Sequence, residues 1–174
     1  MIARQSMDHT CAVKTTSLLT LLLVSLLAPA CGKKIGDGCK TNIDCAQDGT
    51  RICDLSMPGG YCTEDGCDET SCPSESICVR FFNQKFSSTP CTGEPGTIGE
   101  CQPNELCVVC GATPEEKCCV PSGSERRYCA EKCGNDGDCR GGYICRTSET
   151  NGSIALLDDP AASRKAEFCA PIGN

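Results

Sequence analysis

Apolar residues are concentrated near the start of the chain and become sparse after it. A nearly unbroken apolar segment covers residues 17–28 and follows a region that holds Arg4 and Lys14, which is typical of a secretory signal with its apolar h-region. The segment is too short to cross a membrane, because a spanning helix needs about 20 apolar residues and Pro29 ends this run. We therefore predict that residues 1–30 are a signal peptide.

Beyond the leader, apolar positions form only short runs between turn-forming residues. Short strands are predicted at residues 77–82, 106–109 and 143–146. A hairpin turn is predicted at the Met-Pro-Gly-Gly sequence of residues 57–60. Residues 147–165 carry no cysteine and favour a loop or one short helix over residues 155–157. Little helix is expected elsewhere in the exported part.

The composition explains why a conventional core is missing from the pattern. The 174 residues include 20 cysteines but only four phenylalanines, three tyrosines and no tryptophan. Cysteine at this density indicates a disulfide scaffold, because modules that bury little apolar surface are held by crosslinks. We therefore predict a small, disulfide-rich, loop-rich fold with short β-hairpins and little helix outside the signal peptide. The cysteines expected in disulfides are Cys39, Cys45, Cys53, Cys62, Cys67, Cys72, Cys78, Cys91, Cys101, Cys107, Cys110, Cys118, Cys119, Cys129, Cys133, Cys139, Cys145 and Cys169.

The leader ends at the sequence Ala-Pro-Ala-Cys of residues 28–31, which allows two cleavage interpretations. Ala-x-Ala suits an ordinary signal peptidase, which would release a soluble protein that begins at Cys31. The same residues, preceded by Leu26 and Leu27, resemble the lipobox of bacterial lipoproteins. That resemblance implies that the Cys31 thiol receives a diacylglycerol and its freed amine a further acyl chain. Residues 31–38 would then be the lipidated cysteine and a tether.

The number of cysteines favours lipidation. Removal of the leader takes Cys11 away and leaves 19 cysteines, an odd number that would strand one thiol or bridge two chains. If Cys31 is a thioether, 18 cysteines remain and all of them can pair. Two or more acyl chains make membrane attachment durable. Gly32 after the cysteine resembles lipoproteins sorted to an outer membrane, so we predict a lipid-anchored protein of the cell envelope, with the outer membrane favoured over the inner one.

A short motif repeats along the exported part. Residues 39–45 and 133–139 share the form C-x2-[ND]-x-D-C, and each copy is followed by a glycine and an Ile-Cys pair that ends at Cys53 or Cys145. A looser third copy covers residues 67–78. Asp and Asn side chains accept hydrogen bonds from nearby backbone N–H groups and form tight turns. The loops between the cysteines are therefore predicted to be turns rather than helices.

The motif, which is best formed over residues 133–145, resembles the N-terminal cysteine-rich module of Dickkopf-type proteins, which also occurs in bacterial cysteine-rich lipoproteins. The resemblance covers residues 39–78 and 129–145. In that family such modules bind proteins and are not enzymes, so the resemblance implies a binding module.

Turn-forming residues suggest how the exported part is organised. The segment 87–99 is rich in Ser, Thr, Pro and Gly around Cys91 and favours a turn-rich connection. We predict cysteine-rich module 1 over residues 39–86, a turn-rich cysteine-rich connecting module over 87–128 and cysteine-rich module 2 over 129–174.

Charge and histidine content exclude several function classes. The net charge is −7 and no basic stripe is present, so the electrostatic footprint of a nucleic-acid-binding protein is missing. The only histidine is His9, which leaves with the signal peptide, so the exported part has no histidine for catalysis or metal binding. We predict that the protein is not an enzyme, needs no cofactor or metal and does not bind nucleic acid.

Several local groupings have both a structural and a functional interpretation. Cys107 and Cys110 form a C-x-x-C pair that suits a redox or zinc site, but structural pairing with distant partners is favoured. The adjacent Cys118 and Cys119 are expected to reach two different partners. The carboxylates of Asp44, Asp48, Asp136 and Asp138 could hold calcium, but turn formation explains them without a metal.

Phe81 and Phe82, beside Arg80, form the densest aromatic patch of the chain. One of these rings could be exposed as a surface that contacts a partner, but the favoured interpretation is that Phe81 and Phe86 pack over disulfides.

The leader, the cysteines and the repeat together predict a non-catalytic, membrane-anchored lipoprotein. Its acyl chains on Cys31 would hold it to the membrane, and its role would be binding, adhesion or envelope structure, with an extracellular or periplasmic protein or carbohydrate as partner. The alternative is a secreted inhibitor of a hydrolase that presents an exposed segment, residues 122–127, on a rigid framework.

Overall fold

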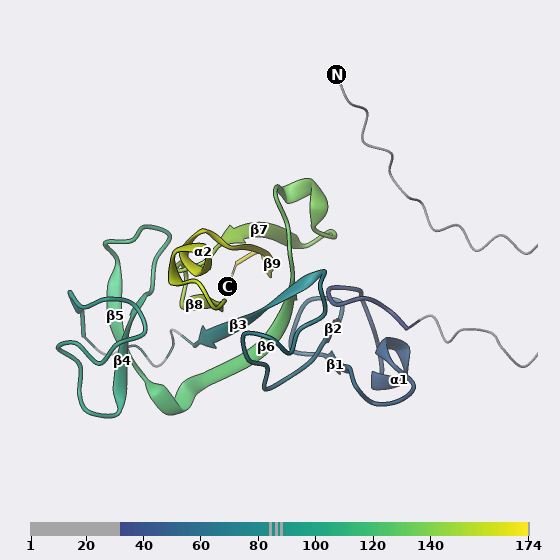
Figure 1. Cartoon of the computed structure of the whole chain (residues 1–174), viewed down its shortest axis with the longest axis horizontal. Coiled ribbons are helices and arrows are strands. Elements are labelled where there is room, and N and C mark those ends of the chain that lie inside the picture. Colours follow the sequence, from purple (N-terminus) through teal and green to yellow (C-terminus); the bar gives the residue numbers. More distant parts are fainter. Residues whose placement is uncertain (1–31, 84, 86, 88, 174) are drawn as a thin grey trace, which may run out of the picture. The chain divides into compact units, whose positions relative to one another are not determined.

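The structure is a computed structural model, and it describes residues 32–83, 85, 87 and 89–173. The predicted signal peptide and Cys31 lie outside the described residues. Short strands dominate the described part, and the helices are brief (Figure 1). The helical elements are α1 (Asn42–Cys45), η2 (Ser122–Ser124), η3 (Asp136–Asp138) and α2 (Pro160–Lys165). The strands are β1 (Ile52–Asp54), β2 (Tyr61–Thr63), β3 (Ser76–Phe82), β4 (Glu105–Val109), β5 (Lys117–Pro121), β6 (Glu125–Glu131), β7 (Tyr143–Thr147), β8 (Ser153–Leu156) and β9 (Glu167–Pro171).

The strands form four small antiparallel sheets in the described part of the chain. Three sheets are two-stranded pairs, β1 with β2, β4 with β5 and β7 with β9, and the fourth has the order β6-β3-β8. This architecture confirms the predicted disulfide-rich, loop-rich fold with little helix. Among the described residues, no helix combines the length and apolar character needed to cross a membrane.

The predicted strands at residues 77–82, 106–109 and 143–146 are confirmed as β3, β4 and β7, each slightly longer than expected. The predicted turn at residues 57–60 joins β1 to β2, and the Gly60 N–H donates to the Met57 carbonyl at 3.0 Å. Only glycine fits at this position, because Gly60 has φ of 67° and an added Cβ would lie 2.1 Å from the Cys39 carbonyl oxygen.

The predicted short helix over residues 155–157 is wrong. Ala155 and Leu156 belong to strand β8 (Ser153–Leu156). Ala155 is buried there and pairs with Val79 of β3. Pairing with the edge of a central sheet outweighs the local preference of the segment. The helix of this region, α2, begins later, at Pro160, where the Asp159 side chain accepts a hydrogen bond from the Ala161 N–H at 2.9 Å.

One arrangement of four cysteines occurs four times in the structure, and we call it the four-cysteine unit. The first cysteine bonds the third, the second bonds the fourth, and the third and fourth lie directly opposite each other on two antiparallel strands. The members are Cys39, Cys45, Cys53 and Cys62 in unit 1; Cys67, Cys72, Cys78 and Cys129 in unit 2; Cys91, Cys101, Cys107 and Cys119 in unit 3; and Cys133, Cys139, Cys145 and Cys169 in unit 4.

The interior consists of several small clusters rather than one large core. Two of the clusters contain only cysteines, from unit 1 and unit 3. One cluster without buried cysteines includes Val79, Tyr128 and Ala155 of the central sheet and Phe168 of β9. Disulfides therefore replace apolar packing in parts of the molecule, as the scarcity of large side chains predicts.

An arginine joins unit 1 to unit 4. The Arg140 guanidinium lies 4.2 Å from the ring centroid of Tyr143 and donates to its hydroxyl at 2.7 Å and to the Pro58 carbonyl at 2.9 Å. Tyr61 of β2 stacks on Tyr143 of β7 with ring centroids 5.4 Å apart. These contacts hold the β1–β2 turn against β7.

Candidate functional site

The repeated motif forms the same hydrogen-bonded turn in units 1 and 4. The Asp44 carboxylate accepts from the Lys40 and Thr41 N–H groups at 2.8 and 2.9 Å. The Asp138 carboxylate accepts from the two equivalent groups of its own unit, Gly134 and Asn135, at 2.8 and 3.1 Å. The hydrogen bond from Lys40, followed by that from Thr41, holds the pKa of Asp44 below its ordinary value.

The other polar position of the motif binds the strand that follows. The Asn42 side-chain oxygen accepts from the Cys53 N–H at 2.9 Å, and the Asp136 carboxylate accepts from the Cys145 N–H at 2.9 Å. Asp48 accepts from the Thr50 N–H at 3.1 Å. The oxygens considered as calcium ligands therefore act as acceptors for local N–H groups, which explains why Asn can replace Asp in one copy.

Every cysteine in the described part of the chain is in a disulfide, and the structure contains nine of them. Cys107 and Cys110 do not bond each other but pair with Cys91 and Cys118. The adjacent Cys118 and Cys119 reach different partners, since Cys119 pairs with Cys101. In each unit, three sulfur atoms lie within 4.8 Å of one another, but all are bonded in disulfides and so are not thiolates that could hold zinc.

Unit 3 is a fourth copy of the repeat that the sequence motif did not predict, because it lacks the Asp and Asn turn residues. A weaker signal is present, since Cys101 and Cys107 have the same spacing as Cys139 and Cys145. An aliphatic residue also precedes the third cysteine in every unit, as Ile52, Ile77, Leu106 and Ile144.

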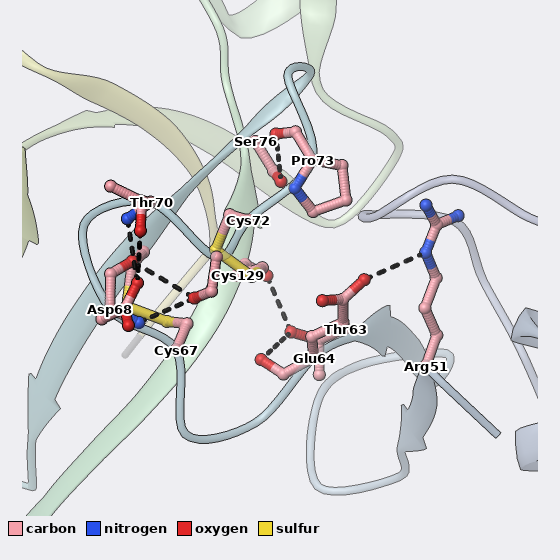
Figure 2. Close-up of a disulfide and its surroundings, with 12 residues drawn as sticks. Arg51, Thr63, Glu64, Cys67, Asp68, Thr70, Cys72, Pro73, Ser76 and Cys129 are labelled. Carbon is pink, nitrogen blue, oxygen red and sulfur yellow. Dashed lines mark hydrogen bonds and ion pairs between the residues drawn. A yellow bond between two sulfur atoms is a disulfide. The ribbon is translucent and has the colours of Figure 1, made fainter.

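The two disulfides of unit 2 link the segment that follows β2 to strands β3 and β6 of the central sheet (Figure 2). Its Cys72–Cys129 disulfide lies beside Thr63, whose buried hydroxyl donates to the Cys129 carbonyl at 2.7 Å. Asp68 accepts from the Thr70 N–H at 2.9 Å, and this bond holds its pKa below the ordinary value. Asp68 therefore forms the turn of this looser copy, which has no Asp before its middle cysteine.

A cavity of the described part lies where the β1–β2 turn, the end of β3 and strands β6, β7 and β9 converge. Its volume is about 500 Å³, within the range of small-molecule sites. The lining residues are Ser56, Met57, Phe81, Asn83, Lys85, Ser124, Arg126, Tyr128, Arg146, Ser153, Phe168, Ala170 and Pro171. The wall is formed by segments that lie next to the cysteines of units 1, 2 and 4, so the disulfide framework positions this cavity.

Two arginines form part of the cavity wall. Arg126 donates to the Asp54 carboxylate at 2.7 Å and to the Asp65 carboxylate at 3.0 Å, and these bonds fix its guanidinium. Arg146 is buried and donates to the Pro171 carbonyl at 3.3 Å. Burial lowers the pKa of Arg146, because the charged form loses hydration.

Aromatic rings complete the wall. Tyr128 is buried, and burial raises the pKa of its hydroxyl to about 12 against the opposing effect of Arg126 and Arg146. Phe81 is half-buried and lines the cavity, whereas Phe82 is fully buried in another cluster. The two neighbouring phenylalanines therefore have different roles, and Phe86 lies outside the described residues.

The segment 122–127 is only partly the exposed loop that was expected. Its first three residues form η2, but Glu125 begins β6 and pairs with Phe82. Glu125 also accepts hydrogen bonds from Arg80, at 2.6 Å, and from Arg127. Burial alone raises the pKa of Glu125, but these two arginines outweigh it and leave the pKa below its ordinary value.

Nine disulfides, small hairpin sheets and sulfur-filled clusters define the class of the molecule, which is an exported, disulfide-stapled, cysteine-rich protein. Comparisons with protein-family models, with curated proteins and with solved structures find no match.

Proposed function

We propose that the protein is a non-catalytic lipoprotein of the cell envelope, anchored through acyl chains on Cys31, whose folded part binds an extracellular or periplasmic partner. The cysteine pairing carries this proposal. The 18 cysteines from Cys39 onward bond one another, so none of them is a disulfide partner for Cys31. A thioether bond between the Cys31 sulfur and a diacylglycerol would account for this odd cysteine.

The start of the folded part also supports the proposal. Ile35 is fully buried among Tyr61, Tyr143 and several cysteines, and the Gly36 N–H donates to the Cys62 carbonyl at 3.0 Å. Within the tether predicted at residues 31–38, only the described residues 32–34 are exposed before Ile35, and they span about 10 Å at full extension. An acylated Cys31 would hold the folded part close to the membrane surface.

A non-catalytic role accords with the chemistry of the exported part. The cysteines from Cys39 to Cys169 are in disulfides, the motif carboxylates bind backbone N–H groups, and the only histidine is in the predicted leader. Binding needs none of these groups to react. We therefore expect the protein to inhibit no member of a protease panel, since the proposed inhibitory segment is mostly strand β6 and its flanking turn.

The anchor is tested by mass spectrometry of the N-terminal peptide and by phase separation in detergent. The wild-type peptide should carry the mass of two or more acyl chains on Cys31, and the protein should enter the detergent phase. Cys31→Ser should move it to the aqueous phase, whereas the matched change Cys11→Ser in the leader should not. An unmodified Cys31 thiol on the exported protein would overturn the anchor.

A further inference from the structure

We propose that the cavity between β3, β6, β7 and β9 is a binding site for a small organic anion, with a carboxylate head toward Arg126 and Arg146 and a flat apolar body against the aromatic rings. The inference deepens the binding role proposed above and rests on it, because it assigns that role a location and a ligand class. It does not depend on the anchor.

The charge of the cavity wall is opposite to that of the whole chain. The protein has a net charge of −7, yet its described cavity lining contains three basic residues, Lys85, Arg126 and Arg146, and no Asp or Glu. Arg126 is compensated by the carboxylates of Asp54 and Asp65 outside the lining, so the excess positive charge of this concave surface comes from Lys85 and Arg146, and it attracts an anion and repels a cation. Guanidinium groups bind carboxylates through paired N–H donors, which gives direction as well as charge.

The two arginines are held in place before any ligand arrives. The carboxylates of Asp54 and Asp65, which are not part of the lining, bind Arg126 through its two terminal nitrogens. Each terminal nitrogen carries a second N–H, so Arg126 retains donors for a ligand. Arg146 is fixed between β7 and the end of β9 by its bond to the Pro171 carbonyl. A preorganised pair of this kind loses little freedom on binding.

The apolar part of the wall selects the body of the ligand. Three of the seven aromatic residues of the chain, Phe81, Tyr128 and Phe168, line this one cavity, together with Met57 and Pro171. Aromatic rings bind flat apolar groups by stacking and edge contacts. A free volume of about 500 Å³ accommodates a fused two-ring body, which an inorganic anion would leave unfilled.

Calorimetry with 2-naphthoate and its neutral isostere 2-naphthamide tests this assignment on the purified, oxidised protein. We expect naphthoate to bind at least tenfold more tightly than naphthamide, and to bind more weakly as salt is added. Equal affinities for the two compounds, or no binding of naphthoate, would overturn the site.

Variants then locate the binding. Arg146→Gln should reduce naphthoate affinity tenfold or more and leave naphthamide affinity unchanged, whereas Phe81→Ala should weaken the binding of both probes.

The matched control is Lys165→Gln, which removes an exposed positive charge from α2, away from the lining. Circular dichroism and a thiol count verify that each variant is folded and oxidised, and if Arg146→Gln fails to fold, Phe81→Ala carries the test alone. A control variant that weakens naphthoate as much as Arg146→Gln, or an unchanged affinity in Phe81→Ala, would show that the cavity is not the site.

Naphthoate titration and mass spectrometry of the same wild-type preparation separate the two proposals. Naphthoate binding without acylation of the wild type would overturn only the lipoprotein anchor. An acylated protein that does not bind naphthoate would overturn only the anion site.

Discussion

Units 1 and 4 use the same turn and the same disulfide pattern, but they differ in what lies between their third and fourth cysteines. In unit 1 a tight turn connects Cys53 to Cys62. In unit 4 the interval from Cys145 to Cys169 contains β8 and α2 (Figure 1). The cysteines and turn carboxylates thus define a local framework, and an insertion at one position of that framework adds new structure without altering it.

The insertion changes how the two regions are stabilised. The buried cluster of unit 1 consists of Cys39, Cys45 and Cys62. The insertion of unit 4 brings Ala155 onto the central sheet, where it packs in the same cluster as Phe168. Unit 1 therefore depends on sulfur, whereas the region around unit 4 combines sulfur with apolar packing, and that region also forms much of the cavity wall.

Complete reduction should produce the largest effect and abolish the difference between the two regions. Each disulfide contributes about 2–4 kcal/mol by restricting the unfolded chain, against a net stability of about 5–15 kcal/mol for a typical domain. We expect the dispersed amide NMR spectrum to collapse when a phosphine reductant exposes all 18 thiols of the folded part without denaturant. A spectrum that keeps its dispersion after a complete thiol count would show that apolar packing suffices.

Truncation of an apolar side chain should separate the two regions. Phe168 is 1% exposed, so Phe168→Ala should lower the free energy of unfolding by about 3–5 kcal/mol. Hydrogen exchange should lose protection first in β3, β8 and β9, while β1 and β2 keep theirs. The control is Ile172→Ala, just after β9, where the side chain is 62% exposed and the expected change is within about 0.5 kcal/mol. Equal loss of protection in β1 and β2 would contradict the division into two regions.

The features that depend on short stretches of sequence could be predicted. Cysteine density indicated the fold class, and the short apolar runs between turn-forming residues located β3, β4 and β7. The Asp and Asn positions of the repeat indicated turns because their hydrogen bonds reach only a few residues, as from Asp44 to Lys40.

The features that depend on contacts between distant segments could not be predicted from the sequence. The Cys72–Cys129 disulfide joins residues 57 positions apart, and the residues between them contain all of unit 3. Ala155 lies in a strand rather than a helix because it pairs with Val79, which is 76 positions earlier in the chain. The cavity needs Phe81, Arg126 and Arg146 in one place, and only the assembled sheets bring them there.

A smaller effect should come from the contact that joins unit 1 to the central sheet. Asp54 of β1 is 7% exposed and binds Arg126 of β6, so Asp54→Asn should lower the free energy of unfolding by about 1–3 kcal/mol. Burial alone raises the pKa of Asp54, but hydrogen bonds from Ser56 and Arg126 outweigh it and leave the pKa below its ordinary value of 3.8.

This lowered pKa gives the contact a pH dependence with a defined sign. The folded state binds the Asp54 proton less readily than the unfolded state, so the stabilisation is complete above the ordinary pKa of 3.8 and is lost as the pH falls through the lower, folded pKa. Denaturant titrations from pH 6 to pH 2 should therefore show a steeper loss of stability in the wild type than in Asp54→Asn. Parallel curves would contradict the assignment, and Glu69→Gln, an exposed carboxyl, provides the control.

The smallest effect should come from the turn that units 1 and 4 share, and it should be the same in both. Asp44 and Asp138 each accept two hydrogen bonds from backbone N–H groups that precede the motif helix or 3₁₀ turn. Asp44→Ala and Asp138→Ala remove the same two backbone bonds from exposed turns, and Asp138→Ala also removes an exposed bond from the Asn135 side-chain amide at 3.0 Å. Each should lower Tm by less than Asp54→Asn and by amounts that differ little from each other. If the insertion after Cys145 altered the framework of unit 4, the two decreases in Tm would differ clearly, because the two turns would then contribute differently to stability. Equal decreases in Tm would instead show that the turn of unit 4 is independent of the segment inserted between Cys145 and Cys169, which forms part of the cavity wall.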